Sequence, residues 1–185
     1  MFFRTIFHIA LARLRRPIGI YDVSRSWFRT LPTDQDVLGH MNNGVYFSIM
    51  DIARFDQTIR SGTWDVFRAR GWYPVVVSET LSFRKSLTLG QRFAIESRIL
   101  GFDDKAVYVE QRFVRPDADG RLEVYAKGYI RGRFLKKTGG TVPIAEVIEA
   151  SGGIPEGLEV PQRLLDWGQA VQLPATRAAA PSLWL

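Results

Sequence analysis

The sequence predicts an α+β fold in which an antiparallel meander of strands surrounds one buried helix. Residues 43–60 are apolar around most of the helical circumference in their first turns, which is typical of a buried helix. From residue 73 onward apolar and polar residues alternate with a period of two, as in β-strands. The chain has 185 residues, of which 46% are hydrophobic, so we expect a single domain over residues 1–185 with a substantial core.

The elements are expected in a simple order along the chain. Residues 1–19 form an amphipathic N-terminal helix and its end, because Pro17 and Gly19 break it. The first strand spans residues 21–31, with Val23, Trp27 and Leu31 spaced for one face. The remaining elements of the main body are the helix 43–60, a short helix 63–71 and the strands 74–86, 91–100, 106–115 and 121–135.

Residues 138–185 are expected to form a C-terminal extension. Gly139 and Gly140 end the last strand, and two short helices are expected near residues 144–150 and 161–172. The tail from residue 173 is rich in proline and alanine, so it is mobile unless Trp184 anchors it.

The N-terminal helix has two interpretations. Its apolar part is shorter than the roughly 20 residues that span a bilayer, and its arginines follow the apolar run, the reverse of a secretory signal. Residues 1–16 can pack onto the protein or a partner subunit, which we favour, or lie on a membrane among lipid headgroups. We expect His8 to be structural. The apolar residues concerned are Phe2, Phe3, Ile6, Phe7, Ile9, Ala10 and Leu14.

Composition narrows the partners and the compartment. The absence of cysteine excludes disulfides, thiolate zinc sites and a cysteine nucleophile. It also fits a reducing compartment, so we expect a cytoplasmic protein, with membrane association as the open alternative. The net charge of +6 favours anionic partners: a phosphorylated cofactor, nucleic acid or an anionic membrane.

One stretch concentrates the polar chemistry of the chain. Asp34 and Asp36 open a loop that continues through His40 to Asn42, and the helix 43–60 follows. Unpaired backbone N–H groups and the positive end of a helix dipole together stabilise a developing negative charge. The ordinary alternative is a polar loop that caps a helix, because asparagine is a good N-cap residue.

This stretch resembles the signature loop of the hot-dog thioesterases of the 4-hydroxybenzoyl-CoA and acyl-CoA type. The pattern over residues 21–137, DQDVLGHMNN followed by an aromatic-rich helix and strands, looks closest to the thioesterase superfamily member six branch. The resemblance implies a hot-dog fold, a curved sheet wrapped around one long helix. It also implies hydrolysis of a fatty acyl-CoA without a cofactor or metal. The matching residues are Asp36, Gly39, His40, Asn42, Asn43 and Tyr46.

The resemblance also implies roles for individual residues. Asp36 would attack the thioester carbonyl or activate water, and N–H groups near Asn43 and Gly44 would form the oxyanion hole. One such donor is worth about 2.7–4 kcal/mol in a transition state. His40 and Asn42 would shape the loop or orient substrate, and they favour an acyl-CoA over an aromatic substrate.

Further residues are candidates for binding and support. Tyr46 is expected to contact the substrate. Four cations are candidates for binding the phosphates of CoA, and the alternative for each is that it belongs to a solvated basic face. Three carboxylates are expected to support the site. Asp34 would cap the loop, and Asp51 would form an ion pair along the helix. Glu79 would face the core, where burial would raise its pKa. The candidate cations are Arg84, Lys85, Arg131 and Arg133.

The resemblance implies a homodimer or tetramer, and the open sheet edge gives a physical reason. We expect a composite site, with Asp36 from one subunit and helix N–H groups from the other. Nucleic acid is not expected, although residues 125–131 interleave aromatic and basic groups, because such binding would not explain the acidic loop. A non-catalytic protein that binds acyl-CoA or an acyl carrier, or a membrane-associated structural protein, remains the alternative to an enzyme.

Overall fold

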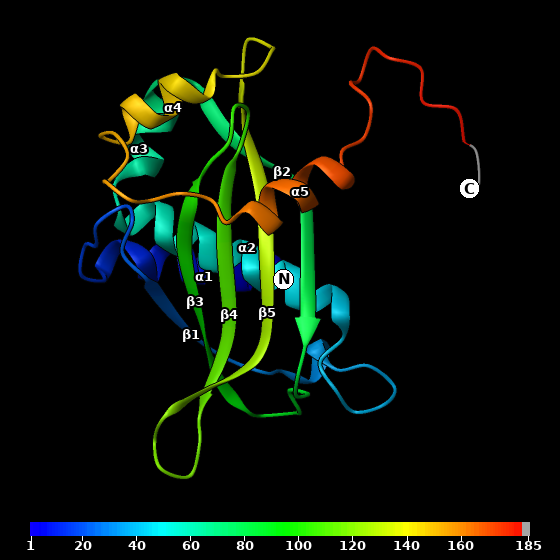
Figure 1. Cartoon of the computed structure of the whole chain (residues 1–185). Coiled ribbons are helices and arrows are strands. Elements are labelled where there is room, and N and C mark those ends of the chain that lie inside the picture. The colour runs from blue at the N-terminus through cyan, green and yellow to red at the C-terminus, as the bar shows by residue number, and fades with distance from the viewer. Residues whose placement is uncertain (183–185) are drawn as a thin grey trace.

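A long helix, α2 (Asn43–Arg60), lies across one face of a five-stranded antiparallel sheet in the computed structural model, which describes residues 1–182 (Figure 1). The strand order is β1-β3-β4-β5-β2, so β1 and β2 are the edges. This arrangement confirms the predicted α+β class and the hot-dog fold. The strands are β1 (Ser24–Arg29), β2 (Trp72–Phe83), β3 (Arg92–Phe102), β4 (Val107–Pro116) and β5 (Leu122–Lys136). The other helices are α1 (Phe2–Leu14), η1 (Pro32–Asp34), α3 (Thr63–Ala69), α4 (Ile144–Ala150) and α5 (Gln162–Ala170).

The main core lies between α2 and the sheet, as the apolar pattern of the helix predicts. Ile49 and Met50 of α2 are fully buried against residues of β3, β4 and β5. The backbones approach closely at Gly128, where an added Cβ would lie 2.6 Å from the carbonyl oxygen of Thr80 and 3.0 Å from Met50 Cε. Only glycine fits there without a shift, so β5 can pass directly beneath the helix.

The inward faces of β3, β4 and β5 are those expected from alternation, whereas the predicted face of β1 is wrong. Val23 and Leu31 are 50% and 42% exposed, while Ser26 and Phe28 on the opposite face are buried. Phe28 decides the orientation because its ring stacks on Phe93 in the core, with ring centroids 5.7 Å apart.

A bulge in β2 changes the predicted alternation of that strand. The register shifts between Val76 and Ser78, which moves Val75 to the face opposite Leu81. Glu79 pairs with the buried Ile130 and therefore lies on the face of Leu81, as predicted.

The C-terminal helices form close to the expected positions. Helix α5 crosses the sheet face opposite α2 (Figure 1), where Leu164 packs against Leu100 and Tyr108. Helix α4 covers one end of the sheet with Val147 buried. The proposed anchor Trp184 lies outside the described residues.

Helix α1 packs on the protein through its polar face, so its apolar residues do not pack on the body of this chain as expected. Arg4 pairs with Asp34 at 2.8 Å and Arg15 pairs with Asp56 at 2.7 Å. These buried acids draw the arginine side of the helix inward. The opposite side is exposed, at 49–85% of each side chain's surface: Phe2, Phe3, Ile6, Phe7 and Leu14. No helix within residues 1–182 is long and apolar enough to cross a membrane.

His8 is structural, as predicted, and gives α1 a pH dependence. The ring is buried and stacks on Phe28, with centroids 4.4 Å apart. Burial, with Arg15 and Arg4 nearby, lowers the pKa of His8 from 6.5 to about 4, against an opposing effect of Asp56. Between these values the unfolded chain binds a proton that the folded chain does not, so stability falls as the pH decreases.

We expect the free energy of unfolding to fall by about 2–3 kcal/mol through His8 between pH 6.5 and pH 4. Urea unfolding at several pH values measures this loss. His8→Phe keeps a ring against Phe28 and should flatten the dependence in that range. An unchanged pH profile in the variant would show that other groups titrate instead.

Candidate active site

A tight turn holds Asp36 in the loop before α2. The Asp36 N–H donates to the carbonyl oxygen of His40 at 2.8 Å, and the turn passes through Gly39 with φ of +77°. A left-handed residue at this point favours glycine, which explains Gly39. Backbone pairing of Gln35 with Met41 closes the turn, and pairing of His40 with Thr88 fixes it to the body of the protein.

The two carboxylate oxygens of Asp36 have different surroundings. Oδ1 accepts from the N–H of Leu38 at 2.8 Å and from the N–H of His40 at 3.2 Å. Oδ2 receives no hydrogen bond from any residue within 1–182. The half-buried side chain is therefore held in one orientation with one oxygen available for chemistry. The side chain of His40 is exposed beside it.

The N-terminus of α2 is capped as the sequence predicts. Asn42 Oδ1 accepts from the N–H of Gly44 at 2.9 Å. This bond engages the N–H of Gly44, one of the two donors expected for the oxyanion hole. The N–H of Asn43 has no acceptor among the described residues, and it lies at the positive end of the helix dipole.

Asp34 has a structural position below the loop. Its side chain is buried and accepts from Arg4 and, at 2.9 Å, from the N–H of Leu31. The Asn42 N–H donates to the Asp34 carbonyl oxygen at 2.8 Å, which joins the two ends of the loop. No group of three metal-binding side chains is found in the part of the chain described.

Tyr46 lies within the core beneath the same loop. Its hydroxyl accepts from the N–H of Leu87 at 3.3 Å, and its ring contacts Phe83 and Phe113. Burial raises the pKa of Tyr46. This residue therefore supports the loop from below and is not exposed to a ligand.

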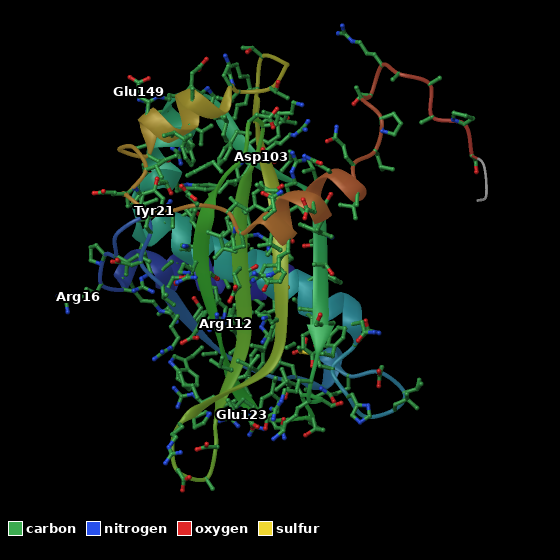
Figure 2. The ribbon with its side chains drawn as sticks, in the orientation of Figure 1. Arg16, Tyr21, Asp103, Arg112, Glu123 and Glu149 are labelled. Carbon is green, nitrogen blue, oxygen red and sulfur yellow. The ribbon has the colours of Figure 1, made fainter. Side chains whose placement is uncertain are left out.

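Two of the four candidate cations are exposed. Arg84 and Lys85 both pair with Glu123, at 2.7 and 2.8 Å, near the β4–β5 hairpin (Figure 2). They lie a few residues before Thr88, which pairs with His40 of the loop. Their position is compatible with phosphate groups that approach this end of the protein.

Arg131, also expected to contact CoA, is a buried cation that already has an acidic partner. It is 5% exposed and donates through Nε and Nη2 to Asp103 at 3.0 and 2.8 Å, at the end of the sheet that α5 crosses (Figure 2). Burial opposes the ionisation of Asp103, but hydrogen bonds from Lys105 N–H, Arg131 and Tyr108 lower its pKa overall. Arg133 is half-buried on the same face, and its Nε lacks a partner in the described chain.

Midway along α2 a polar network joins helix and sheet. Arg54 pairs with Asp51 and donates to Gln111 Oε1 at 2.7 Å, and Gln111 donates to Ser97 at 2.8 Å. Burial raises the pKa of Glu79, which Arg54 opposes and Asp51 reinforces. The predicted helical ion pair of Asp51 with Arg54 is therefore present, and both residues lie near Glu79. Sequence reasoning missed Gln111, since a lone glutamine in a strand carries no signal of its partners.

Three comparisons relate this geometry to known proteins. A family model described as a thioesterase-like superfamily matches residues 30–168. Protein THEM6 of Xenopus laevis is 46% identical over 84 residues, which cover 45% of this chain and 41% of that protein. Protein THEM6 of Drosophila melanogaster is 25% identical over 175 residues, which cover 93% of this chain and 86% of that protein. The chain therefore matches about two fifths of the length of the Xenopus relative.

The solved structure of a 4-hydroxybenzoyl CoA thioesterase from a Pseudomonas strain has the same fold. Its TM-score is 0.60 at 18% identity, and the match covers 69% of this chain and 98% of that one. At this identity the likeness concerns the fold alone.

Proposed function

The chain belongs to the thioesterase-like superfamily, and we propose on this premise that it hydrolyses an acyl-CoA thioester to a free acid and CoA. One observation carries the proposal. Asp36 is held through Oδ1 and presents an Oδ2 that is unpaired within residues 1–182, in the loop that leads to the N–H of Asn43, which is unpaired within the same residues. A carboxylate and an N–H donor are the two groups that thioester hydrolysis requires.

The proposed reaction begins at the thioester carbonyl. Asp36 Oδ2 either attacks the carbonyl carbon or takes a proton from a water that attacks it. In both routes the carbonyl oxygen becomes negative, and the Asn43 N–H stabilises it. The C–S bond then breaks, and CoA leaves as a thiolate that takes a proton. After direct attack, water hydrolyses the acyl–Asp36 anhydride.

Arg84 and Lys85 are the proposed contacts for CoA phosphates. Both are exposed and share one carboxylate, Glu123, so a diphosphate would compete with a single acid for two cations. Hydrogen bonds from these two cations lower the pKa of Glu123.

A second copy of the chain is proposed to complete the site. Strand β2 is an edge of the described sheet, and its exposed apolar residues include Tyr73, Val76 and Val77. The loop that carries Asp36 lies beyond this edge (Figure 1), and its tip residue Val37 is fully exposed. Pairing of two β2 edges would cover these residues and bring the loop of one copy to α2 of the other.

Release of free thiol from a panel of acyl-CoAs, from acetyl to palmitoyl and including benzoyl, tests the proposed activity. We expect turnover with at least one aliphatic acyl-CoA. Tight binding of acyl-CoAs without any thiol release would instead favour a non-catalytic binding protein.

A further inference from the structure

A cavity of about 170 Å³ lies under the C-terminal half of α2, away from the capped N-terminus. Its walls come from α2, from the inward face of the sheet, and from α3 and α4. They are largely apolar, and they include Phe55, Ile99, Val109, Ile130, Phe134 and Val147. Sequence periodicity does not indicate this space, because most of its lining consists of ordinary apolar core residues.

The lining residues also show where the cavity opens. Among those within the described chain, only Asp51, Pro74 and Val76 are exposed. The opening therefore lies between α2 and the edge strand β2. Arg54 lines the same end, where Asp51 and Gln111 already satisfy it.

One polar group inside the cavity lacks a partner. Gln57 lines the cavity and is 5% exposed. Its Nε2 donates no hydrogen bond to any acceptor within residues 1–182. A buried donor without an acceptor is energetically costly, so such groups are normally satisfied by a ligand or water. Gln57 lies six residues beyond Asp51, ~9 Å along the helix axis.

The size of the cavity limits its occupant. An apolar cavity of roughly 150 Å³ stays dry and binds a benzene molecule. The cavity under α2 therefore accommodates about six carbon atoms.

We propose that this cavity binds the acyl group of the substrate: a chain of about six carbons with an oxygen near its far end that accepts a hydrogen bond from Gln57. The proposal rests on the proposed thioesterase function. The opening at the β2 edge faces the side on which a second copy would bring its Asp36 loop. The thioester would lie at the opening and the oxygenated end of the chain near Gln57.

Substitutions of Gly132, which lines the cavity, fill this space to different extents. A Cβ added there would lie 3.4 Å from Val107 Cγ1 and 3.6 Å from the Val75 carbonyl oxygen, which is ordinary contact. Gly132→Ala therefore fits, whereas the two further methyl groups of Gly132→Val occupy the space of the chain. S-hexyl-CoA, a thioether that cannot be hydrolysed, measures binding apart from turnover.

We expect S-hexyl-CoA to bind wild type and Gly132→Ala alike, and Gly132→Val at least about 10-fold more weakly in calorimetry. S-methyl-CoA should bind all three proteins alike, which checks that the valine variant is folded. Equal affinity of wild type and Gly132→Val for S-hexyl-CoA would overturn the assignment of the cavity. Absence of turnover with every thioester, together with the expected binding pattern, would refute the enzyme and leave the pocket intact.

Gln57 is tested with a second pair of ligands. We expect wild type to bind the non-hydrolysable thioether S-(ω-hydroxyhexyl)-CoA up to about 10-fold more tightly than S-hexyl-CoA. Gln57→Met keeps a similar volume without the amide, so it should lose this preference while retaining S-hexyl-CoA affinity. A preference that persists in Gln57→Met, or its absence in wild type, would refute the role of Gln57.

Discussion

Asp36→Asn is expected to lower kcat for acyl-CoA hydrolysis by about 10²–10⁴-fold, the range typical of a lost acid–base group. Asparagine keeps an oxygen that can accept from the N–H groups of Leu38 and His40, so the turn should remain intact. The unpaired carboxylate oxygen becomes an amide nitrogen that neither attacks a carbonyl nor takes a proton. Thiol release reports the rate, and calorimetry with a non-hydrolysable CoA thioether reports binding, which should be retained.

The chain offers a matched control for this substitution. Asp117 Oδ1 accepts from the N–H groups of Asp119 and Arg121, each at 2.9 Å, in the β4–β5 hairpin. This is the same kind of turn as that of Asp36, but it belongs to a hairpin that carries no residue of the proposed chemistry. Asp117→Asn should leave kcat unchanged. If both variants retain full activity, the proposed role of Asp36 is wrong.

Asp56→Asn is expected to reduce the free energy of unfolding by about 3 kcal/mol, because it breaks a buried ion pair by removing one partner. The carboxylate has no exposed surface and receives Arg15 at 2.7 Å and Arg60 at 3.1 Å. Without it, the guanidinium groups of Arg15, which directly follows α1, and of Arg60 at the end of α2 face each other in a partly buried position. Chemical denaturation at neutral pH measures the loss.

An exposed pair provides the comparison for Asp56. Asp104 pairs with Lys105 at 3.2 Å, and its side chain is 73% exposed. Surface pairs of this kind contribute about 0–1 kcal/mol, so Asp104→Asn should have little effect on unfolding. Similar losses in the two variants would mean that burial does not determine the contribution of Asp56.

The sequence predicts the parts of the fold that depend on local periodicity. The buried face of α2 and the inward faces of β3 to β5 follow from apolar spacing alone. The orientation of α1 does not, because it is fixed by ion pairs between residues 30 and 41 positions apart, Arg4–Asp34 and Arg15–Asp56. The alternation of β2 fails at a bulge that no residue type announces.

The candidate site divides in the same way. The turn at Asp36 and the cap at Asn42 involve neighbours within four residues, so local chemistry indicates them. Arg131 looks like a surface cation in the sequence, because nothing there indicates that Asp103 and α5 will cover it. Gln57 is likewise one polar residue in a helix, and only the assembled core makes it an unpaired donor in a cavity.

The ion pair between Arg4 and Asp34 connects the N-terminal helix α1 directly to the proposed site. Asp34 holds Leu31 through its side chain and Asn42 through its carbonyl oxygen, so α1 is joined by short polar contacts to both ends of the loop that carries Asp36. The outer side of α1 exposes a row of phenyl and aliphatic side chains. Binding of that row to a lipid surface or to another protein would shift α1, and the Arg4–Asp34 contact would pass this shift to the loop. The rate of hydrolysis would then depend on whether α1 is bound.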